Sequence, residues 1–281
     1  MGNGVLIVRK FGSIGDMLMM TPAIRLLSKR EKTKIDIAAQ KQFFDVFKNN
    51  EFVGKLIPLN SSYNNDYSNV INLSDYEFNY EQTHQPFIEK TKIELFCEAV
   101  GEKCIDTRLD IFLASSEKEK VCRWLKERKI QPKRFIVLAV NSANPTRNWP
   151  LEKWKKLAEE ATKKTDMRIV VADKETCWKA NKKVFFFNSK GIRELFALIN
   201  ESALVITPDS GALHIAGALE KKCISIFGPT DPAMRVLYKN SRFIRKDVGC
   251  NPCWYKRCEK RFCLEMISVD EVLQKMLEEI N

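Results

Sequence analysis

Short apolar runs alternate with amphipathic stretches from one end of this 281-residue chain to the other. Arg168–Ala172 and Val184–Phe187, for example, are mostly apolar runs of strand length, and the helical pattern of Ile192–Ile199 follows them. Parallel strands need crossover connections, which are usually helices. The alternation therefore predicts an α/β protein with a parallel sheet in each half of the chain.

The other expected elements follow the same pattern. We expect further strands at Val5–Val8, Lys34–Ala39, Lys55–Leu59, Ser68–Leu73, Leu109–Leu113, Phe135–Val140, Ala203–Thr207 and Cys223–Phe227. We expect further helices at Met17–Arg30, Gln42–Phe47, Glu89–Val100, Ser115–Arg128, Leu151–Ala161, Gly211–Leu219 and Ser268–Ile280. Pro22 falls inside the first of these helices, where the loss of one backbone hydrogen bond predicts a kink.

A polar segment that contains a proline, Gln131–Arg134, precedes the buried strand expected at Phe135–Val140. Its composition is typical of a connection between domains. We therefore expect a first domain at residues 1–130, a second domain at 131–265 and a final helix within 266–281.

The chain carries 47 lysines and arginines against 36 acidic residues, a net charge of +11. Such an excess favours anionic partners, such as phosphorylated sugars or lipids, although no basic block interleaved with aromatic residues indicates a nucleic-acid surface. No apolar run approaches ~18 residues, and the N-terminus has no charged leader ahead of a long apolar core. We therefore expect a cytoplasmic protein, with peripheral contact at the inner membrane face as an extension of that prediction.

Four of the nine cysteines gather near the C-terminus: Cys250, Cys253, Cys258 and Cys263. An odd total in a chain without a leader argues against a disulfide framework. A close pair followed by two more cysteines suits tetrahedral thiolate coordination of zinc or iron. Two interpretations stay open, a structural metal site and a set of free or packed thiols.

The stretch Pro208–His214 lies between two expected strands and opens a short helix. Asp209 and Ser210 are good helix caps, and the first helical turn offers backbone N–H groups that suit a phosphate or diphosphate. An ordinary strand–loop–helix connection fits these seven residues as well. A second loop, Phe227–Pro232, favours the phosphate interpretation, because the ends of adjacent parallel strands open onto the same crevice.

The loop Arg9–Asp16 follows the first expected strand and leads into a helix. Its glycines, Gly12 and Gly15, do not have the spacing of a dinucleotide-binding fingerprint. Asp16 is the best candidate in the sequence for a general base, because its carboxylate stands beside a helix start above a strand end. The competing interpretation is that Asp16 only caps the helix.

Four ordered stretches occur along residues 5–275: Ser13–Ile24, Pro145–Pro150, Asp209–Pro232, and the cysteine cluster with Ile267 and Val272. Together they resemble glycosyltransferase family 9, the ADP-heptose:lipopolysaccharide heptosyltransferases. The resemblance implies the GT-B architecture, in which two Rossmann-like domains with parallel sheets face each other across a cleft. It also implies inverting, metal-independent sugar transfer without a catalytic cofactor, and the sequence offers no Asp-x-Asp pair for a bridging Mg²⁺.

The resemblance implies that the N-terminal domain meets the acceptor and the C-terminal domain holds the nucleotide sugar. The expected donor is ADP-heptose, and the expected acceptor is the lipopolysaccharide core or a related anionic glycan or glycolipid. In this architecture the final helix often crosses back to the N-terminal domain. Asp16 is then the expected base, and the residues expected to meet the acceptor are Lys10, Ser13 and Gly15. The residues expected to bind the donor diphosphate are Ser142, Thr146, Arg147, Asp209, Ser210, Gly211, Ala212, Leu213, His214 and Thr230.

Two positions depart from the family pattern, and a third position has two interpretations. Arg147 stands where lysine is usual, which keeps the charge and allows a bidentate grip on phosphate oxygens. Asn72 stands where aspartate is usual. Trp149 fits a base-stacking residue or a hydrophobic staple before a helix, and the staple is favoured.

Two other functions fit the same residues. A protein with this fold could use a different nucleotide sugar and a protein or nucleic-acid acceptor. The basic net charge and the short N-terminal half are compatible with such an acceptor. The chain could also be a non-catalytic module that binds a nucleotide sugar without transferring it.

Overall fold

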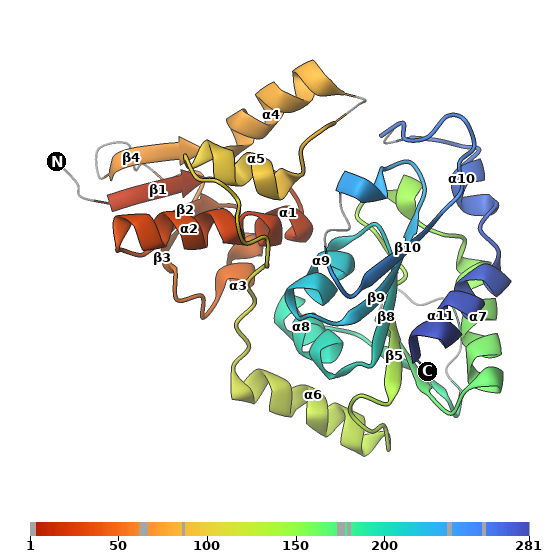
Figure 1. Ribbon diagram of the computed structural model, residues 1–281. Coiled ribbons are helices and arrows are strands. Elements are labelled where there is room, and N and C mark those ends of the chain that lie inside the picture. Colours follow the sequence, from red (N-terminus) through yellow and green to blue (C-terminus); the bar gives the residue numbers. More distant parts are fainter. Residues whose placement is uncertain are drawn as a thin grey trace. The chain divides into compact units, whose positions relative to one another are not determined.

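The computed structural model describes residues 4–61, 67–85, 88–172, 178, 181–234, 238–254 and 257–280. Contacts between residues divide the chain into a first unit, Met1–Phe112, and a second unit, Leu113–Asn281. Each unit contains a parallel sheet with helices, as the alternation of elements predicts, and each is described by itself (Figure 1).

The sheet of the first unit has, within the described residues, four parallel strands in the order β3-β2-β1-β4. The central strands are almost fully buried, and the edge strands are more exposed. The chain places β2 on one side of β1 and later returns to place β4 on the other side. The strands are β1 (Gly4–Val8), β2 (Ile35–Ala39), β3 (Val53–Pro58) and β4 (Tyr67–Asn72).

The helix expected from Met17 to Arg30 is two helices, α1 (Ile14–Met19) and α2 (Thr21–Glu31), with Met20 between them. Pro22 lies in the first turn of α2, where its missing N–H costs no helical hydrogen bond. The proline therefore marks a new helix start and not a kink. The remaining helical elements of this unit are a 3₁₀ turn at Lys41–Phe43, α3 (Phe44–Phe47), α4 (Leu73–His84) and α5 (Lys92–Ala99).

The sheet of the second unit has, within the described residues, six parallel strands in the order β10-β9-β8-β5-β6-β7. The strand order reverses between β5 and β8, because β6 is added on one side of β5 and β8 on the other. Such a switch point is where open α/β sheets bind ligands. The strands are β5 (Phe135–Leu138), β6 (Arg168–Ala172), β7 (Val184–Phe187), β8 (Leu204–Pro208), β9 (Lys222–Phe227) and β10 (Ser241–Arg245).

Helices cover both faces of this sheet, with α8 and α9 on one face and α7 and α11 on the other (Figure 1). The core under α7 and α11 contains Trp149, Trp154 and Leu157 together with Val272 and Met276. The helical elements are α6 (Ser115–Glu127), a 3₁₀ turn at Pro145–Arg147, α7 (Leu151–Lys164), α8 (Ile192–Glu201), α9 (Gly211–Ala218), a 3₁₀ turn at Pro232–Met234, α10 (Phe262–Glu265) and α11 (Val269–Ile280).

The division of the chain falls at Phe112, before the polar segment Gln131–Arg134 that the sequence indicated as a boundary. The reason is the helix α6, which packs on α8 of the second unit. The Arg193 guanidinium of α8 forms an ion pair with Glu117 of α6, with 2.7 Å between Nη2 and Oε2. Helix α6 therefore belongs to the second unit.

The final helix α11 packs its apolar face inside the second unit. Val272, Leu273 and Met276 of α11 are buried in the core with Trp154 of α7. The helix also contacts β9. The amphipathic pattern of α11 therefore correctly indicated a helix with one buried face.

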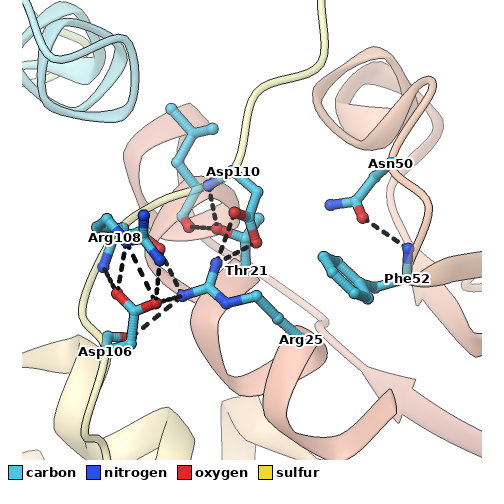
Figure 2. A network of polar contacts seen from close by, with 8 residues as sticks. Thr21, Arg25, Asn50, Phe52, Asp106, Arg108 and Asp110 are labelled. Carbon is cyan, nitrogen blue, oxygen red and sulfur yellow. Dashed lines mark hydrogen bonds and ion pairs between the residues drawn. The ribbon is translucent and has the colours of Figure 1, made fainter. Parts of the chain in front are cut away.

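Residues 109–113 form no strand, which corrects the sequence-based expectation. This segment is held by side chains instead of a strand partner (Figure 2). The Thr21 hydroxyl accepts a hydrogen bond of 2.9 Å from the Asp110 N–H, and the Arg25 guanidinium lies 2.5 Å from the Asp110 carboxylate. Arg25 also donates hydrogen bonds to the carbonyl oxygens of Asp106 and Arg108.

None of the helices in the described part of the chain is long and apolar enough to cross a membrane.

Candidate functional site

Three loops of the second unit follow neighbouring strands at the carboxyl edge of its sheet. They are residues 139–150 after β5, 209–210 after β8 and 228–231 after β9. The stretches singled out in the sequence for donor binding lie on these loops and in the first residues of α9. The first two flank the switch point between β5 and β8.

The Asp209 carboxylate joins these three loops. Its Oδ2 accepts a hydrogen bond of 2.8 Å from the Thr230 hydroxyl and lies 3.3 Å from Nη1 of Arg147. Asp209 is 2% exposed, and Thr230 is fully buried. A buried carboxylate needs such partners, because an unpaired buried charge is costly. Asp209 is therefore placed to hold Arg147 and Thr230 in position.

The Arg147 side chain has a second polar group at this edge of the sheet, in addition to the nitrogen that faces Asp209. Its Nε is buried and has no hydrogen-bond partner among the described residues, while a quarter of the side chain is exposed. A buried donor without a partner costs free energy unless a ligand or water satisfies it. A phosphate oxygen is a suitable acceptor, because guanidinium groups bind phosphates through several N–H donors.

Helix α9 begins at this edge with Ser210 as its N-cap. The Ser210 hydroxyl accepts a hydrogen bond from the Ala212 N–H and is also bonded to the Thr207 hydroxyl at 2.8 Å. The Leu213 N–H donates to the Ser210 carbonyl oxygen. Two of the N–H groups expected to meet a phosphate, those of Ala212 and Leu213, are thus used within the turn, so a phosphate here would rely on Ser210 and Gly211.

His214 is 4% exposed, and its Nδ1 lies 2.7 Å from the Tyr238 hydroxyl. The two rings meet edge to face, with centroids 5.9 Å apart. Tyr238 can lie against α9 only because Gly217 has no side chain, since a Cβ there would come within 2.4 Å of the tyrosine ring. His214 therefore ties α9 to Tyr238, a partner that the sequence analysis did not anticipate.

The loop after β5 is tied to the loop after β8 by Ser142. The Ser142 hydroxyl donates to the Asp209 carbonyl oxygen at 3.0 Å, and the Ser142 N–H donates to the Asn148 side chain at 2.6 Å. Thr146 is 5% exposed, and its hydroxyl donates to the Asn144 side chain. Both predicted donor-binding residues thus have a clear part in shaping this loop.

Trp149 is a core residue, as the favoured interpretation of the sequence held. It is 2% exposed, packs edge to face against Trp154 at 5.1 Å between ring centroids, and donates from Nε1 to the Ile267 carbonyl oxygen. A ring buried in this way is not available to stack on a nucleotide base.

In the first unit, the loop after β1 brings Ser13 and Asp16 together. Oδ2 of Asp16 accepts hydrogen bonds from the Ser13 N–H at 2.5 Å and from the Ser13 hydroxyl at 2.7 Å. Gly12 has φ of 138°, and a Cβ there would lie 3.0 Å from the Asp16 Cβ, so the loop needs glycine at this position. Asp16 does cap α1, but only one of its two oxygens is used for that purpose.

The second oxygen of Asp16 faces two cations. Oδ1 lies 2.5 Å from Nζ of Lys92 on α5 and 3.8 Å from Nη2 of Arg9 at the end of β1. Both cations also pair with Glu77 of α4, and the Arg9 contact is 2.5 Å. Asp16 is therefore part of a four-residue charge network, defined here as Arg9, Asp16, Glu77 and Lys92.

Of the residues expected to meet an acceptor, Lys10 and Ser13 lie on this loop, and Gly15 lies in the helix α1 that follows it. The Lys10 side chain is half exposed and pairs with Asp75 at 3.0 Å. Gly15 is buried in α1. Ser13 is engaged with Asp16, so its hydroxyl positions the carboxylate in addition to any contact with a substrate.

The four C-terminal cysteines line one pocket of about 480 Å³ in the second unit, together with Thr146 and Pro229. Burial raises the pKa of the Cys263 thiol. The negative charge of the other three cysteines raises it further, because like charges disfavour ionisation. Within the ranges that the structure describes, however, no three Cys, His, Asp or Glu side chains are grouped closely enough to hold a metal ion. The structure therefore does not confirm the metal site expected at these cysteines.

Sequence reasoning missed Glu77, Lys92 and Tyr238. They lie far along the chain from the loops they contact, and no motif surrounds them. One signal was present in Lys92, because a lysine at the first position of a helix is electrostatically unfavourable and therefore suggests an acidic partner.

A family model described as glycosyltransferase family 9 (heptosyltransferase) matches residues 57–262. This range is well over half of the chain and includes Arg147, Asp209 and Thr230, while Asp16 lies before it. The chain belongs to glycosyltransferase family 9, the heptosyltransferase family. The resemblance carried by the sequence motifs is thereby confirmed.

Among characterised proteins, lipooligosaccharide heptosyltransferase 2 of Campylobacter jejuni is 29% identical over 93 residues. The aligned part is 32% of this chain and 29% of that protein, so it spans less than a third of the relative's length.

The fold is shared with solved structures over nearly the whole chain. ADP-heptose lipopolysaccharide heptosyltransferase II of E. coli superimposes with a TM-score of 0.76 at 15% identity, over 99% of this chain and 98% of that one. The iron-containing dodecameric glycosyltransferase TibC of enterotoxigenic E. coli gives a TM-score of 0.73 at 13% identity, over 99% of this chain and 76% of that one. The predicted fold class, two parallel-sheet α/β domains of the GT-B type, is confirmed.

Proposed function

We propose that this protein transfers a sugar, with inversion and without a catalytic metal, from a nucleotide diphosphate sugar to a glycan of the lipopolysaccharide core or a related acceptor. The observation that carries the proposal is the arrangement around Asp209. Its carboxylate holds Arg147 and Thr230 beside the start of α9, at the switch point of the sheet. These are the groups that a departing diphosphate needs.

The expected donor is ADP-heptose, which agrees with family membership and with the description of the E. coli relative as an ADP-heptose enzyme. The second unit would bind this donor through Arg147, the N–H groups of Ser210 and Gly211, and the loops tied together by Ser142 and Asp209. The guanidinium of Arg147 would neutralise part of the charge that develops on the diphosphate as it leaves.

Asp16 of the first unit would act as the base. The acceptor hydroxyl gives its proton to the Asp16 carboxylate while its oxygen forms the new bond to the sugar carbon. The bond from that carbon to the donor phosphate breaks on the opposite face, and the diphosphate leaves with the electron pair. One displacement of this kind inverts the configuration at the sugar carbon.

The net charge of +11 favours an anionic acceptor and supports peripheral contact with an anionic membrane face. Lys10 would reach such an acceptor only by giving up its exposed ion pair with Asp75. An exposed pair of this kind is worth little, typically ~0–1 kcal/mol, so the exchange is inexpensive.

Ligand-induced thermal shifts against ADP-, UDP-, GDP- and CDP-sugars test the donor. A donor present at ~100 times its Kd stabilises the folded protein by ~2.7 kcal/mol. Transfer assays with the stabilising donor then test the reaction, and Asp16→Asn should keep donor binding while losing turnover. Stabilisation without hydrolysis or transfer by the wild type, with any acceptor tried, would indicate a binding module instead.

A structural zinc or iron ion at Cys250, Cys253, Cys258 and Cys263 is a separate proposal. Its support is the common pocket of the four thiols and the iron reported for the TibC neighbour. The arrangement of the described side chains speaks against it. Elemental analysis of the purified protein decides the matter, since one tightly held equivalent per chain supports the proposal and its loss in Cys253→Ser would locate the site.

A further inference from the structure

Asp16 is not held by its own loop alone. The Ser13 N–H and hydroxyl both bind Oδ2 and leave the direction of Oδ1 to the more distant residues of the charge network. Lys92 supplies the closest of these contacts, at 2.5 Å, whereas Arg9 lies 3.8 Å away. The orientation of the carboxylate therefore depends on Lys92.

Lys92 occupies a position that its own helix disfavours. It is the first residue of α5, where the partial positive charge of the helix start repels an ammonium group. Its side chain is only 16% exposed, so it also gives up much of its hydration. The two carboxylates of Asp16 and Glu77, which its ammonium bridges, account for its position.

Glu77 balances the charge of the network. Arg9 is fully buried and Glu77 has 3% of its side chain exposed, so neither charge could stay there without a partner. Two cations and two carboxylates give the network a net charge of zero. With Glu77 in place, Lys92 and Arg9 are shared between two carboxylates, so Asp16 is not their sole acidic partner.

We propose that Lys92 and Glu77 are positioning residues for Asp16: Lys92 fixes the direction of the Asp16 carboxylate, and Glu77 anchors Lys92 and Arg9. This inference rests on the proposed role of Asp16 as the base. It adds to that role two residues from α4 and α5, which are remote from the loop after β1 in sequence and carry no motif of their own.

The test compares Lys92→Met, Lys92→Arg and the charge-balanced double variant Lys92→Met/Glu77→Gln with the wild type, in both stability and transfer kinetics. Lys92→Met should lower kcat by about 10²-fold, the usual effect of misplacing a reacting group by about 1 Å. KM for the donor should not change, because the proposed donor residues belong to the second unit. Lys92→Arg should recover most of kcat.

The double variant separates positioning from folding. It removes one cation and one carboxylate, so the network stays neutral and the stability lost in Lys92→Met should return. The kcat should stay low, because Oδ1 of Asp16 still lacks its lysine. Recovery of kcat in the double variant would overturn the proposal, and so would a wild-type kcat in Lys92→Met.

Lys90→Met is the matched control, since Lys90 lies two residues away, is exposed and pairs with Glu98 instead of Asp16. It should leave kcat at the wild-type value. Crystal structures of the wild type and Lys92→Met give a second readout that needs no activity. A changed Asp16 rotamer in Lys92→Met supports the positioning role even if the wild type transfers no sugar. A wild type without transfer activity would contradict only the proposed function. An unchanged rotamer overturns the inference.

Discussion

The Thr230 hydroxyl donates a hydrogen bond of 2.8 Å to the Asp209 carboxylate, and both side chains are buried. The bond joins the loop after β8 to the loop after β9, and the same carboxylate oxygen holds Arg147 from the loop after β5. The three sequence stretches that pointed to a diphosphate site thus meet at one carboxylate. Asp209 therefore holds Arg147 and Thr230 at the proposed diphosphate site.

Asp209→Ala should therefore reduce both stability and nucleotide binding. The Thr230 hydroxyl and the Arg147 guanidinium lose their shared partner, and such losses at buried groups cost ~1–3 kcal/mol. Urea unfolding measures the first effect and calorimetric titration with ADP the second. Asp231→Asn is the control, because its side chain can still accept the bond from the Ala233 N–H, and it should change neither quantity. Full ADP affinity in Asp209→Ala would contradict this account.

Arg147→Lys should bind ADP more weakly even though the charge is kept. The guanidinium places one nitrogen 3.3 Å from Asp209 and holds the buried Nε ready for a ligand, whereas an ammonium group cannot do both. Hydrogen bonds to charged groups contribute ~1.5–3 kcal/mol, so the Kd for ADP should rise by ~10–150-fold. Lys155→Met, at an ion pair on α7, should leave the Kd unchanged. An equal Kd for Arg147→Lys and the wild type would rule out the proposed phosphate contact.

Local patterns predicted the strands and the loops of the site well, because those features depend on neighbouring residues. Arg168–Ala172 and Val184–Phe187 occur as β6 and β7 with the predicted bounds. Helix α4 was not predicted, since it has no apolar stripe and its Phe78 is 53% exposed. It begins at Leu73 because Asn72 caps it, with the side-chain oxygen accepting from the N–H groups of Ser74 and Asp75.

The partners of the site residues could not be predicted in the same way. Glu77 and Lys92 lie more than 60 positions after Asp16. Their contact with Asp16 can be recognised only when the pairing of β4 with β1 is known, because that pairing brings the following helices to the loop after β1. At Leu109–Leu113 the sequence predicted an element that does not form. Its apolar pattern suits a strand, but contacts with Thr21 and Arg25 on α2 hold this segment instead of a strand partner.

Arg25→Met should destabilise the first unit by about 3–5 kcal/mol, the usual cost of removing one partner from a buried ion pair. Arg25 is 6% exposed and lies 2.5 Å from the Asp110 carboxylate (Figure 2). The substitution leaves the Asp110 carboxylate, whose side chain is only 15% exposed, without its cation. Thermal or urea unfolding measures the effect, and Arg108→Met, on an exposed side chain of the same network, should cost much less. Equal effects of the two substitutions would show that burial of the Arg25 pair is unimportant.

Asp106 and Asp110 should affect the pH dependence of stability in opposite directions. The side-chain hydrogen bond from Arg108 holds the pKa of Asp106 well below its usual range, whereas burial raises the pKa of Asp110. The contribution of Asp106 is therefore present above the unfolded pKa of ~3.9 and is lost as the pH falls through its folded value. The contribution of Asp110 is present at low pH and is lost as the pH rises through its folded value.

Urea unfolding between pH 2 and pH 7 tests both signs. The stability difference between the wild type and Asp106→Asn should shrink as the pH falls below ~4, because the Asp106 carboxyl then takes up protons in the unfolded wild type before it does so in the folded one. The difference between the wild type and Asp110→Asn should instead move in favour of the wild type on acidification. Parallel curves for the two variants would contradict the assigned directions.

Cys104 should react with iodoacetamide faster than Cys122, although both thiols are half-buried. The chain turns back at Gly101, where the Glu102 N–H donates to the Cys97 carbonyl oxygen. Interaction with the Cys97 thiol lowers the pKa of Cys104. The same interaction, together with burial, raises the pKa of Cys97, while burial raises the pKa of Cys122.

The thiolate is the reactive form, so at neutral pH the lower pKa gives Cys104 the larger reactive fraction. Mass spectrometry of peptides after a short exposure to iodoacetamide measures the order of modification. Cys97→Ala removes the thiol that interacts with Cys104, and it should slow the modification of Cys104 without affecting Cys122. If Cys122 reacts as fast as Cys104, the Cys97 contact does not activate Cys104.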